Sequence, residues 1–281
     1  MSPYLHYLEK FSMLGFLTCS MTATGLVIEV GSLLAPLRDK RFLTLALGLN
    51  FLLSPALAWG LARLFHLDPG LTAGFLLVAC AAGAPFLPKL VALARADLSC
   101  GVALMTLLTM GTILFLPLAL PGLIEGFHAD AWEIARPMLL WILGPLLVGM
   151  LLRHYRPTLA ARISLPLDKS GSLFLLVCFV ILVATNLKAM LGLLGSGALL
   201  AAALHASLLF FSAWLLSTHA TDQRAILGLG SAARNFGAAL VPAATSLRDP
   251  HVLVMIVASA IVGSIISFTA ANWVKRRILL P

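Results

Sequence analysis

Long apolar runs divide this chain, and each is about as long as a helix that crosses a lipid bilayer. A transmembrane helix needs about 20 mainly apolar residues, because the hydrocarbon core is about 30 Å thick. Hydrophobic residues form 60% of the 281 residues and charged residues 11%, whereas soluble domains contain about 25% charged residues. The sequence therefore predicts an all-α integral membrane protein. Runs of this length exclude the alternating segments of about ten residues that build outer-membrane barrels.

The apolar runs predict nine membrane spans, joined by short connections that are rich in turn residues. No hydrophilic insert is long enough for a soluble, nucleotide-binding or catalytic domain. Residues 1–281 are therefore predicted to form one transmembrane domain. The spans are expected at about 11–36, 42–65, 71–95, 99–121, 133–152, 167–187, 191–216, 223–246 and 251–274.

The basic residues indicate how the chain lies in the membrane. The formal net charge is +8, but most of the 19 lysines and arginines stand at the ends of apolar runs. This placement is typical of membrane topology, in which basic residues are more frequent on the cytoplasmic side, and it does not indicate nucleic-acid binding. It predicts a multi-pass protein of the cell membrane, taken to be a bacterial inner membrane, with its N-terminus outside and its C-terminus in the cytoplasm.

Two predicted spans, the third and the eighth, contain small residues and helix breakers near their middle, and each then has a cation, Lys89 or Arg234. The two spans are five apart in the chain, so they cross the membrane in opposite directions. Paired interrupted spans predict an inverted-repeat secondary transporter, with its binding site between two crossing discontinuous helices. The residues expected to shape the interruptions are Gly83, Pro85, Pro88, Gly228, Gly230 and Gly237.

Arg234 is the most unusual residue of the eighth span. It lies about 18 Å from the inner membrane surface if each helical residue adds 1.5 Å. A charge at such depth is a candidate functional group, since it is expensive to bury in lipid. Arg234 can pair with an anionic substrate through its planar set of donors. The structural alternative is that Arg234 caps carbonyl groups of the broken helices.

Three further polar residues are candidates for substrate binding. Lys89 either has a substrate or gating role or extends to the inner interface. Asn235 either orients the substrate or ties together the unwound backbone, which must find hydrogen-bond partners within the membrane. His205, near mid-membrane, can couple protons or serve as a hydrogen-bonded structural residue.

Four residues are candidates for ion coupling. Thr106 and Thr109 are three apart and share one helical face, where packing between helices is the alternative role. Asn50 is the third candidate, and its other possible roles are to orient the substrate or to tie the crossing backbone together. Glu29 lies near the cytoplasmic end of the first span, as a candidate proton carrier or a partner for a basic residue such as Lys89.

At these positions the chain resembles the bile acid:sodium symporter family, and the resemblance covers nearly the whole length. The segments that carry it are Met21–Leu26, Asn50–Pro55, Leu93–Asp97 and Arg234–Ala239. The resemblance implies the nine-span form of the family, in which a core domain holds the two crossing helices and a panel domain moves against it. The core would comprise the spans within about 42–121 and 191–274. The panel would comprise the spans at about 11–36, 133–152 and 167–187.

The resemblance also implies sodium ligands, and this chain departs from them at several positions. Sodium-coupled relatives have a Ser-Asn pair where this chain has Leu87 and Pro88. They have a Glu where it has Gly230, and a Gln where it has Arg234. A carboxylate is a preferred ligand of hard cations, so its loss leaves the coupling ion open as sodium at a reduced site, a proton or none. By similarity, the coordinating oxygens that remain belong to Asn50, Thr106 and Thr109, and Arg234 would replace the charge of a bound sodium ion.

The leading hypothesis is secondary active transport of a small organic anion, a carboxylate or a bile-acid-like molecule, by alternating access. Half-helix N-termini and Arg234 would offer positive charge to the anion. The expected partners are this anion, a sodium ion or a proton, and the lipid bilayer, with no other cofactor. The alternative is a non-transporting membrane sensor or scaffold with a transporter-like fold. The sequence gives no support for an enzyme, because it has no recognisable nucleophile constellation or metal-ligand spacing.

Overall fold

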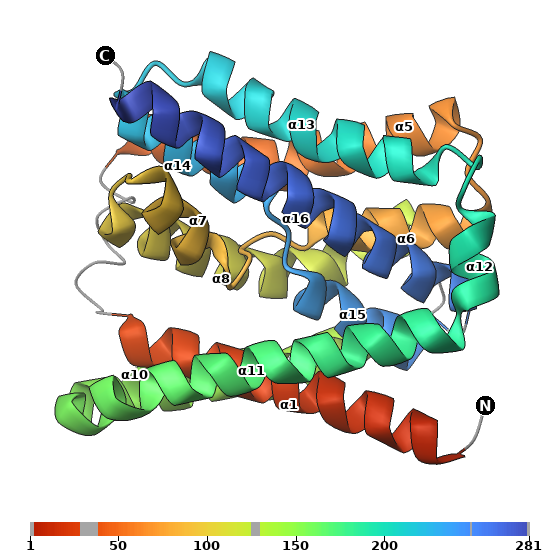
Figure 1. Ribbon diagram of the computed structural model, residues 1–281, viewed down its shortest axis with the longest axis horizontal. Helices are drawn as coiled ribbons and strands as arrows, with labels where there is room; N and C mark the ends of the chain where they lie inside the picture. The colour runs from red at the N-terminus through yellow and green to blue at the C-terminus, as the bar shows by residue number, and fades with distance from the viewer. Residues whose placement is uncertain (1–2, 29–38, 125–129, 248, 280–281) are drawn as a thin grey trace.

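Helices form all the regular structure in the part of the chain that the computed structural model describes, residues 3–28, 39–124, 130–247 and 249–279 (Figure 1). This agrees with the predicted all-α class. Within these ranges, six segments are long and apolar enough to cross a membrane, so the chain is a multi-pass membrane protein. They are Lys40–Leu64, Leu98–Leu123, Ala131–Tyr155, Pro157–Thr185, Ala198–Leu216 and Pro250–Ile278.

The helices lie in the predicted intervals but differ from them at several ends. α11 begins at Pro157 instead of about 167, because proline is favoured in the first turn of a helix and the polar residues that follow do not stop one. The predicted span 191–216 begins with a turn, so the membrane-crossing helix in this interval is α13, which starts at Ala198. The elements are α1 (Pro3–Val27), α4 (Lys40–Gly48), η1 (Leu49–Leu53, a π-helical turn), α5 (Ser54–Leu64), α6 (Pro69–Cys80), α7 (Leu87–Ala94), α8 (Leu98–Leu123), α9 (Ala131–Met138), η2 (Leu139–Leu143, also π-helical), α10 (Gly144–Tyr155), α11 (Pro157–Thr185), α12 (Leu187–Gly192), α13 (Ala198–Leu216), α14 (Thr221–Ala232), α15 (Phe236–Ser246) and α16 (Pro250–Leu279).

The helices are arranged in two groups (Figure 1). α1, α10 and α11 pack against one another along one side and are called the three-helix layer here. The remaining long helices, α5, α6, α8, α13, α14 and α16, form the main bundle together with α7. The three-helix layer contains helices from the intervals predicted as the panel, and the main bundle contains those predicted as the core.

The three-helix layer depends on a close approach between α1 and α10. A Cβ atom on Gly25 would lie 2.9 Å from the Cα atom of Gly149 and would overlap the backbone oxygen of Leu146. A Cβ atom on Gly149 would overlap the backbone oxygen of Thr22. Small residues allow membrane helices to approach closely, so these two glycines set the spacing of the layer.

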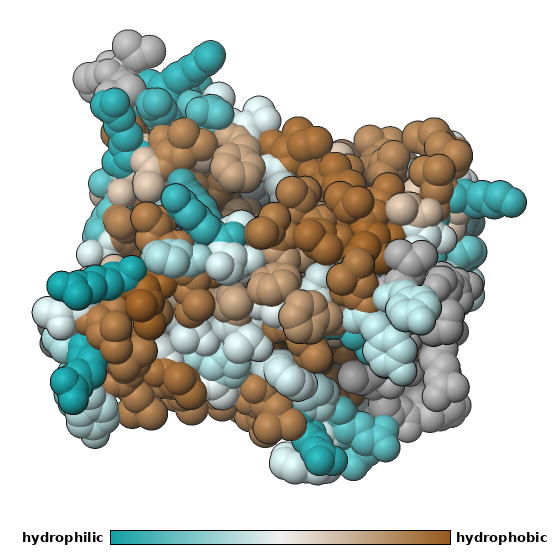
Figure 2. All heavy atoms as spheres, turned by 60° about the horizontal axis from the view of Figure 1, so that its bottom comes forward, coloured by the Kyte–Doolittle hydropathy of each residue, from teal (hydrophilic) through white to brown (hydrophobic). Residues whose placement is uncertain are grey.

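Apolar side chains cover much of the face that the three-helix layer presents, and hydrophilic side chains lie mostly towards its edges (Figure 2). Large apolar residues exposed on α10 and α11 include Leu151, Leu173 and Leu176. A soluble protein rarely exposes so large an apolar area. The face is therefore suited to contact with lipid.

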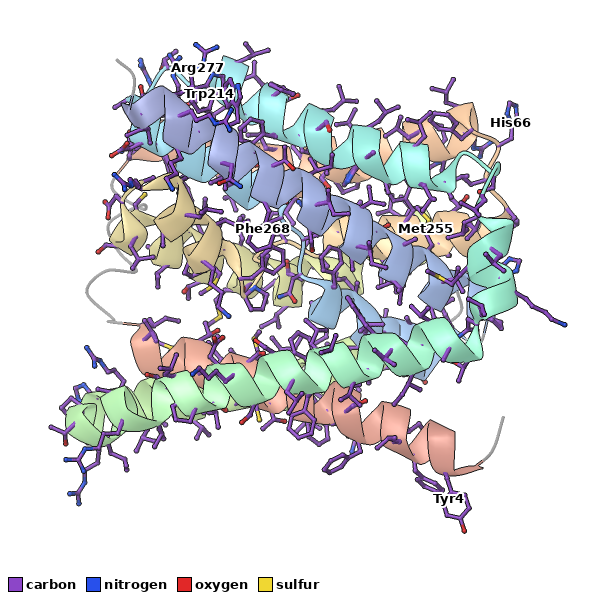
Figure 3. The ribbon with its side chains drawn as sticks, viewed as in Figure 1. Tyr4, His66, Trp214, Met255, Phe268 and Arg277 are labelled. Atoms are coloured by element: carbon purple, nitrogen blue, oxygen red, sulfur yellow. The ribbon has the colours of Figure 1, made fainter. Side chains whose placement is uncertain are left out.

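Tryptophan–arginine pairs stand at opposite ends of the main bundle. The guanidinium of Arg63 lies 5.1 Å from the ring centre of Trp59 in α5, and that of Arg277 lies 5.2 Å from Trp273 in α16. Figure 3 shows Arg277 at one end of the molecule and His66, which follows α5, at the other. Tryptophan is enriched at membrane–water interfaces, so the long axis of Figure 1 is the expected direction of the membrane normal.

The third and eighth predicted spans, 71–95 and 223–246, are both interrupted in the structure, as expected. Residues 81–86 separate α6 from α7, and residues 233–235 separate α14 from α15. The backbone amide of Asn235 donates a hydrogen bond of 2.8 Å to the carbonyl oxygen of Ala81, so the two interruptions cross each other directly.

Four of the residues expected to shape the interruptions lie within them or at their ends. Gly83 has a φ of +79°, which L side chains rarely adopt, and a Cβ atom there would overlap the backbone of Thr109. Pro85 lies between the helices, and Pro88 is in the first turn of α7. Gly237 is in the first turn of α15.

Gly228 and Gly230 do not shape an interruption, contrary to the prediction, because both lie inside the continuous helix α14. A Cβ atom on Gly228 would lie 3.0 Å from the ring of Phe210, and one on Gly230 would lie 2.7 Å from the side chain of Leu104. These glycines instead allow neighbouring helices to pack closely against α14.

Candidate functional site at the crossing of the interrupted helices

Arg234 places its guanidinium group at the crossing, and the residue as a whole is 2% exposed. Its Nη1 donates to Asn50 Oδ1 at 2.8 Å and to the Ser231 carbonyl oxygen at 3.1 Å. Its Nη2 donates to the Ala79 carbonyl oxygen at 2.6 Å and to that of Asn50 at 3.5 Å. Its Nε donates to the Val78 carbonyl oxygen at 3.3 Å. These contacts equal in number the five N–H donors of a guanidinium.

Three of the four carbonyl groups that Arg234 contacts belong to two helix ends, and the fourth is that of Asn50 in η1. Val78 and Ala79 are in the last turn of α6, and Ser231 is in the last turn of α14. The last carbonyl groups of a helix lack partners within it and carry the negative end of the helix dipole. Arg234 therefore satisfies both ends with one buried positive charge, as in the capping alternative. In the same position the guanidinium also acts as a cation that is covalently part of the chain and lies between the ends of α6 and α14.

Asn50 is held so that its amide oxygen faces Arg234. Its Nδ2 donates to the Ala46 carbonyl oxygen at 2.9 Å and to Ser231 Oγ at 3.2 Å. It lies in the π-helical turn η1, and such turns are frequent at functional sites. The oxygen that was predicted to contact an ion is thus already hydrogen-bonded to a guanidinium.

Asn235 ties the two interruptions together, which is the second of the two roles predicted for it. Its Nδ2 donates to the Gly83 carbonyl oxygen at 3.1 Å, and its Oδ1 accepts from the Ala238 amide at 3.0 Å. The second contact caps the N-terminus of α15. One side chain therefore fixes both the unwound segment of the third span and the start of α15.

Two threonines of α8 complete the support of residues 81–86. Thr109 Oγ1 donates to the Gly83 carbonyl oxygen at 3.0 Å. Thr112 Oγ1 accepts from the Ala82 amide at 2.9 Å and lies 3.1 Å from the Ala82 carbonyl oxygen, to which it donates. Unwound backbone inside a membrane protein needs such partners, so α8 acts as the scaffold of the crossing.

Replacing Thr112 with valine is expected to lower the free energy of unfolding by about 2–4 kcal/mol, because two buried backbone groups lose their partner at about 1–2 kcal/mol each. Thr106→Val, in the same helix, is the matched control. Thr106 Oγ1 donates to the Val102 carbonyl oxygen within α8 and, among the described residues, makes no hydrogen bond to the crossing. Thermal unfolding of both proteins in detergent measures the difference. Equal melting temperatures would contradict the scaffold role of Thr112.

Lys89 forms an ion pair with Asp168 of α11, with 2.7 Å between Nζ and Oδ2. The side chains are 52% and 37% exposed. The contact joins α7 of the main bundle to the three-helix layer. Glu29, the predicted partner and proton carrier, lies outside the described residues.

Two cavities lie between the three-helix layer and the main bundle. The larger has a volume of about 230 Å³ and the smaller about 60 Å³. Both are lined by Pro85, Lys89 and Asp168. The smaller one also reaches Arg234, Phe236 and Gly237 at the crossing.

A column of phenyl rings stands beside the smaller cavity. The ring of Phe86, in the first interruption, stacks on Phe236 of α15 at 6.4 Å and on Phe268 of α16 at 6.5 Å. Figure 3 shows Phe268 near the middle of the molecule, on the side of α16 that faces α7 and α8. These rings give the crossing an apolar wall next to its buried charge.

His205 lies away from both cavities. Its Nε2 is 3.1 Å from Ser54 Oγ and 3.2 Å from the Ser54 carbonyl oxygen, and its ring packs on the edge of Phe75. It is buried between α5, α6 and α13, and its contacts are those of the hydrogen-bonded structural alternative.

Sequence reasoning missed three residues of the site, Thr112, Ser231 and Asp168. Thr112 repeats the three-residue spacing of Thr106 and Thr109, so that pattern would have found it. Asp168 could have been found as well, because it is a carboxylate at the start of the predicted span 167–187. Ser231 contributes one contact through its hydroxyl and one through its backbone carbonyl, and no residue type reveals a backbone contact.

Comparison with known proteins places the chain in a family of transporters. A family model described as the sodium bile acid symporter family matches residues 12–193, which is more than half of the chain. The chain is 30% identical over 139 residues to the Arabidopsis thaliana protein named probable sodium/metabolite cotransporter BASS3, chloroplastic. That alignment covers 47% of this chain but 32% of the relative, so the chain spans about a third of its length. The chain therefore belongs to the sodium bile acid symporter family.

Proposed function

We propose that this protein is a secondary transporter of a small organic anion that works by alternating access. The observation that carries the proposal is the buried guanidinium of Arg234 at the crossing of two interrupted helices, beside a cavity between two helix groups. In this proposal the three-helix layer is the panel and the main bundle is the core. The nine-span form and the inverted repeat are part of the same proposal.

Positive charge around the smaller cavity supports an anionic substrate, either a carboxylate or a bile-acid-like molecule. The N-terminus of α15 begins at its wall with Phe236, and α7 begins beside it with Leu87. Helix N-termini carry a partial positive charge. Lys89 in the first turn of α7 adds a full positive charge at this wall, which Asp168 balances while the two are paired, and Arg234 is also among the lining residues. The apolar rings nearby suit the body of an organic solute.

We further propose that Arg234 takes the place of a coupling cation. Family membership and the name of the plant relative support sodium-coupled transport. A sodium ion does not fit among the oxygens at the crossing, since guanidinium nitrogens already lie 2.6 Å and 2.8 Å from two of them. The Thr106 hydroxyl donates to a backbone carbonyl group of its own helix, and the Thr109 hydroxyl shares its proton between the carbonyl oxygens of Met105 and Gly83. Transport in this chain would accordingly proceed without a sodium gradient.

Flux measurements in proteoliposomes test the proposal. Radiolabelled carboxylates are offered to the reconstituted protein with an inward sodium gradient or with choline in its place, each with and without a pH gradient. The expected result is saturable uptake of at least one carboxylate at equal rates in sodium and in choline. Uptake that collapses in choline would refute the replacement of the cation but leave transport intact. Ligand binding without flux would instead support the alternative of a membrane sensor or scaffold.

A further inference from the structure

The Lys89–Asp168 ion pair stands between the two cavities. Along α11, the larger cavity is lined by Ser164 and Leu165 and the smaller one by Ser172 and Leu175, with Asp168 lining both. The order along α1 runs the opposite way, as it should in an antiparallel neighbour: Thr24 and Val27 line the larger cavity, and Phe16 and Ser20 the smaller one. The ion pair therefore lies where the two cavities meet, between the larger cavity and the crossing.

The two partners of the pair come from different helix groups. Lys89 lies on α7 of the main bundle and Asp168 on α11 of the three-helix layer, with 2.7 Å between Nζ and Oδ2. Any movement of the layer against the bundle at this level has to break or lengthen this contact. Both side chains are partly exposed, and exposed ion pairs contribute little to stability, so the contact can open readily.

The chemistry of Lys89 specifies what can replace Asp168. A lysine ammonium is a compact charge with three donors on a flexible stem, so it can donate to any carboxylate in similar geometry. The larger cavity has room for the apolar body of a small carboxylate, at about 230 Å³. It is lined mainly by apolar residues such as Val27, Val102 and Leu165. A carboxylate solute lying in this cavity would place its charged group next to Lys89.

We propose that the Lys89–Asp168 ion pair is a carboxylate-exchange latch. A solute carboxylate in the larger cavity takes the place of Asp168 on the Lys89 ammonium, and this exchange releases α11 from α7 and opens the route to the crossing. Lys89 is then the first substrate-binding residue and Asp168 its internal competitor. The inference deepens the proposed transport function and rests on it for its consequence, the movement of the layer.

Binding measurements on the full-length protein in detergent test the exchange without requiring transport. The probes are hexanoate, benzoate and cyclohexanecarboxylate, each compared with its neutral amide by calorimetric titration. Asp168→Asn removes the competitor and is expected to lower the Kd for carboxylates by up to about fivefold, the limit that an exposed ion pair sets. Lys89→Met is expected to raise the Kd by about tenfold or more, because a charge-assisted hydrogen bond is lost. The amides should respond to neither substitution.

The control variant is Lys169→Met, which removes a lysine charge from the exposed residue next to Asp168 and should leave the carboxylate Kd unchanged. Asp168→Ser is a second way to remove the competitor and should tighten binding as Asp168→Asn does. The latch is refuted if neither Asp168 variant binds any of the three carboxylates more tightly than the unaltered protein. It is also refuted if Lys89→Met binds them as tightly as the unaltered protein.

Flux in proteoliposomes separates failure of the latch from failure of the proposed function. If carboxylate binding responds to both substitutions but no variant moves solute, the exchange stands and the transport function fails. If the unaltered protein moves carboxylates but their binding ignores both substitutions, transport stands and the latch fails.

Discussion

Arg234→Gln is expected to lower the free energy of unfolding by about 3–5 kcal/mol, because several buried carbonyl groups lose a donor at about 1–3 kcal/mol each. A glutamine amide is shorter than a guanidinium and offers two donors. It cannot reach Asn50, Val78 and Ala79 at the same time, as Arg234 does. The loss is measured by thermal unfolding of the purified protein in detergent, followed by circular dichroism.

Sodium should return part of this stability to the Arg234→Gln protein. The carbonyl oxygens of Ala79 and Ser231 and the amide oxygen of Asn50 would remain at the crossing without a cation. Such oxygens are the ligands that hard cations prefer. Sodium chloride is therefore expected to raise the melting temperature of this variant above its value in choline chloride, and to leave the unaltered protein unchanged.

The matched control is Arg162→Gln, which removes the same charge from an exposed position on α11. It should unfold at the temperature of the unaltered protein in both salts. If Arg234→Gln does the same, Arg234 is not needed to hold the crossing together. If Arg234→Gln is destabilised but is no more stable in sodium than in choline, the guanidinium of Arg234 is a structural cap and does not occupy the place of an ion.

Gly25→Ala is expected to destabilise the three-helix layer by about 3 kcal/mol or more, at the upper end of the range for overpacked interiors. Its new methyl group would overlap the backbone oxygen of Leu146, and a backbone atom cannot change rotamer to make room. α1 and α10 would have to move apart. Gly149→Ala should act in the same way from the opposite helix, because its methyl group would overlap the backbone oxygen of Thr22.

Gly60→Ala is the control for these substitutions. Gly60 lies in helix α5, and nothing lies within 4 Å of a Cβ atom placed there. Alanine is favoured over glycine in a helix, so this protein should be as stable as the unaltered one or slightly more stable. Reaction of the buried Cys80 thiol with a dye during heating reports unfolding in all three variants. Equal unfolding of Gly25→Ala and Gly60→Ala would show that the close approach of α1 and α10 is not required.

The sequence predicted the parts of the fold that depend on neighbouring residues. Apolar runs of about 20 residues gave the long helices, since only a helix satisfies its own backbone in lipid. The breaks near Gly83 and Arg234 were visible because glycine, proline and a charge stand together inside apolar segments. Gly228 and Gly230 were misinterpreted, because a glycine that breaks a helix and one that admits a neighbouring helix look alike in a sequence.

The site itself depends on contacts that the sequence does not reveal. The partners of Arg234 are 155 positions away at Ala79 and 184 away at Asn50. The sequence predicted the depth of Arg234. Its role, whether it replaces an ion, binds a substrate or caps helix carbonyl groups, depends on the positions of these oxygens. The pair of Lys89 and Asp168 joins helices from different groups. Only the packing of those groups decides which carboxylate meets which lysine.

If the protein transports an anion as proposed, a cation that is part of the chain changes the energy of each transport cycle. A dissolved ion bound at the crossing would travel with the solute and bring its charge and its gradient, whereas the guanidinium of Arg234 stays with the protein in every cycle. An anion would then cross as a net negative charge, for which the membrane potential contributes about 2.3 kcal/mol per elementary charge per 100 mV. With a potential that is negative inside, this term favours outward movement. Inward movement would require a steep solute gradient or exchange for another anion.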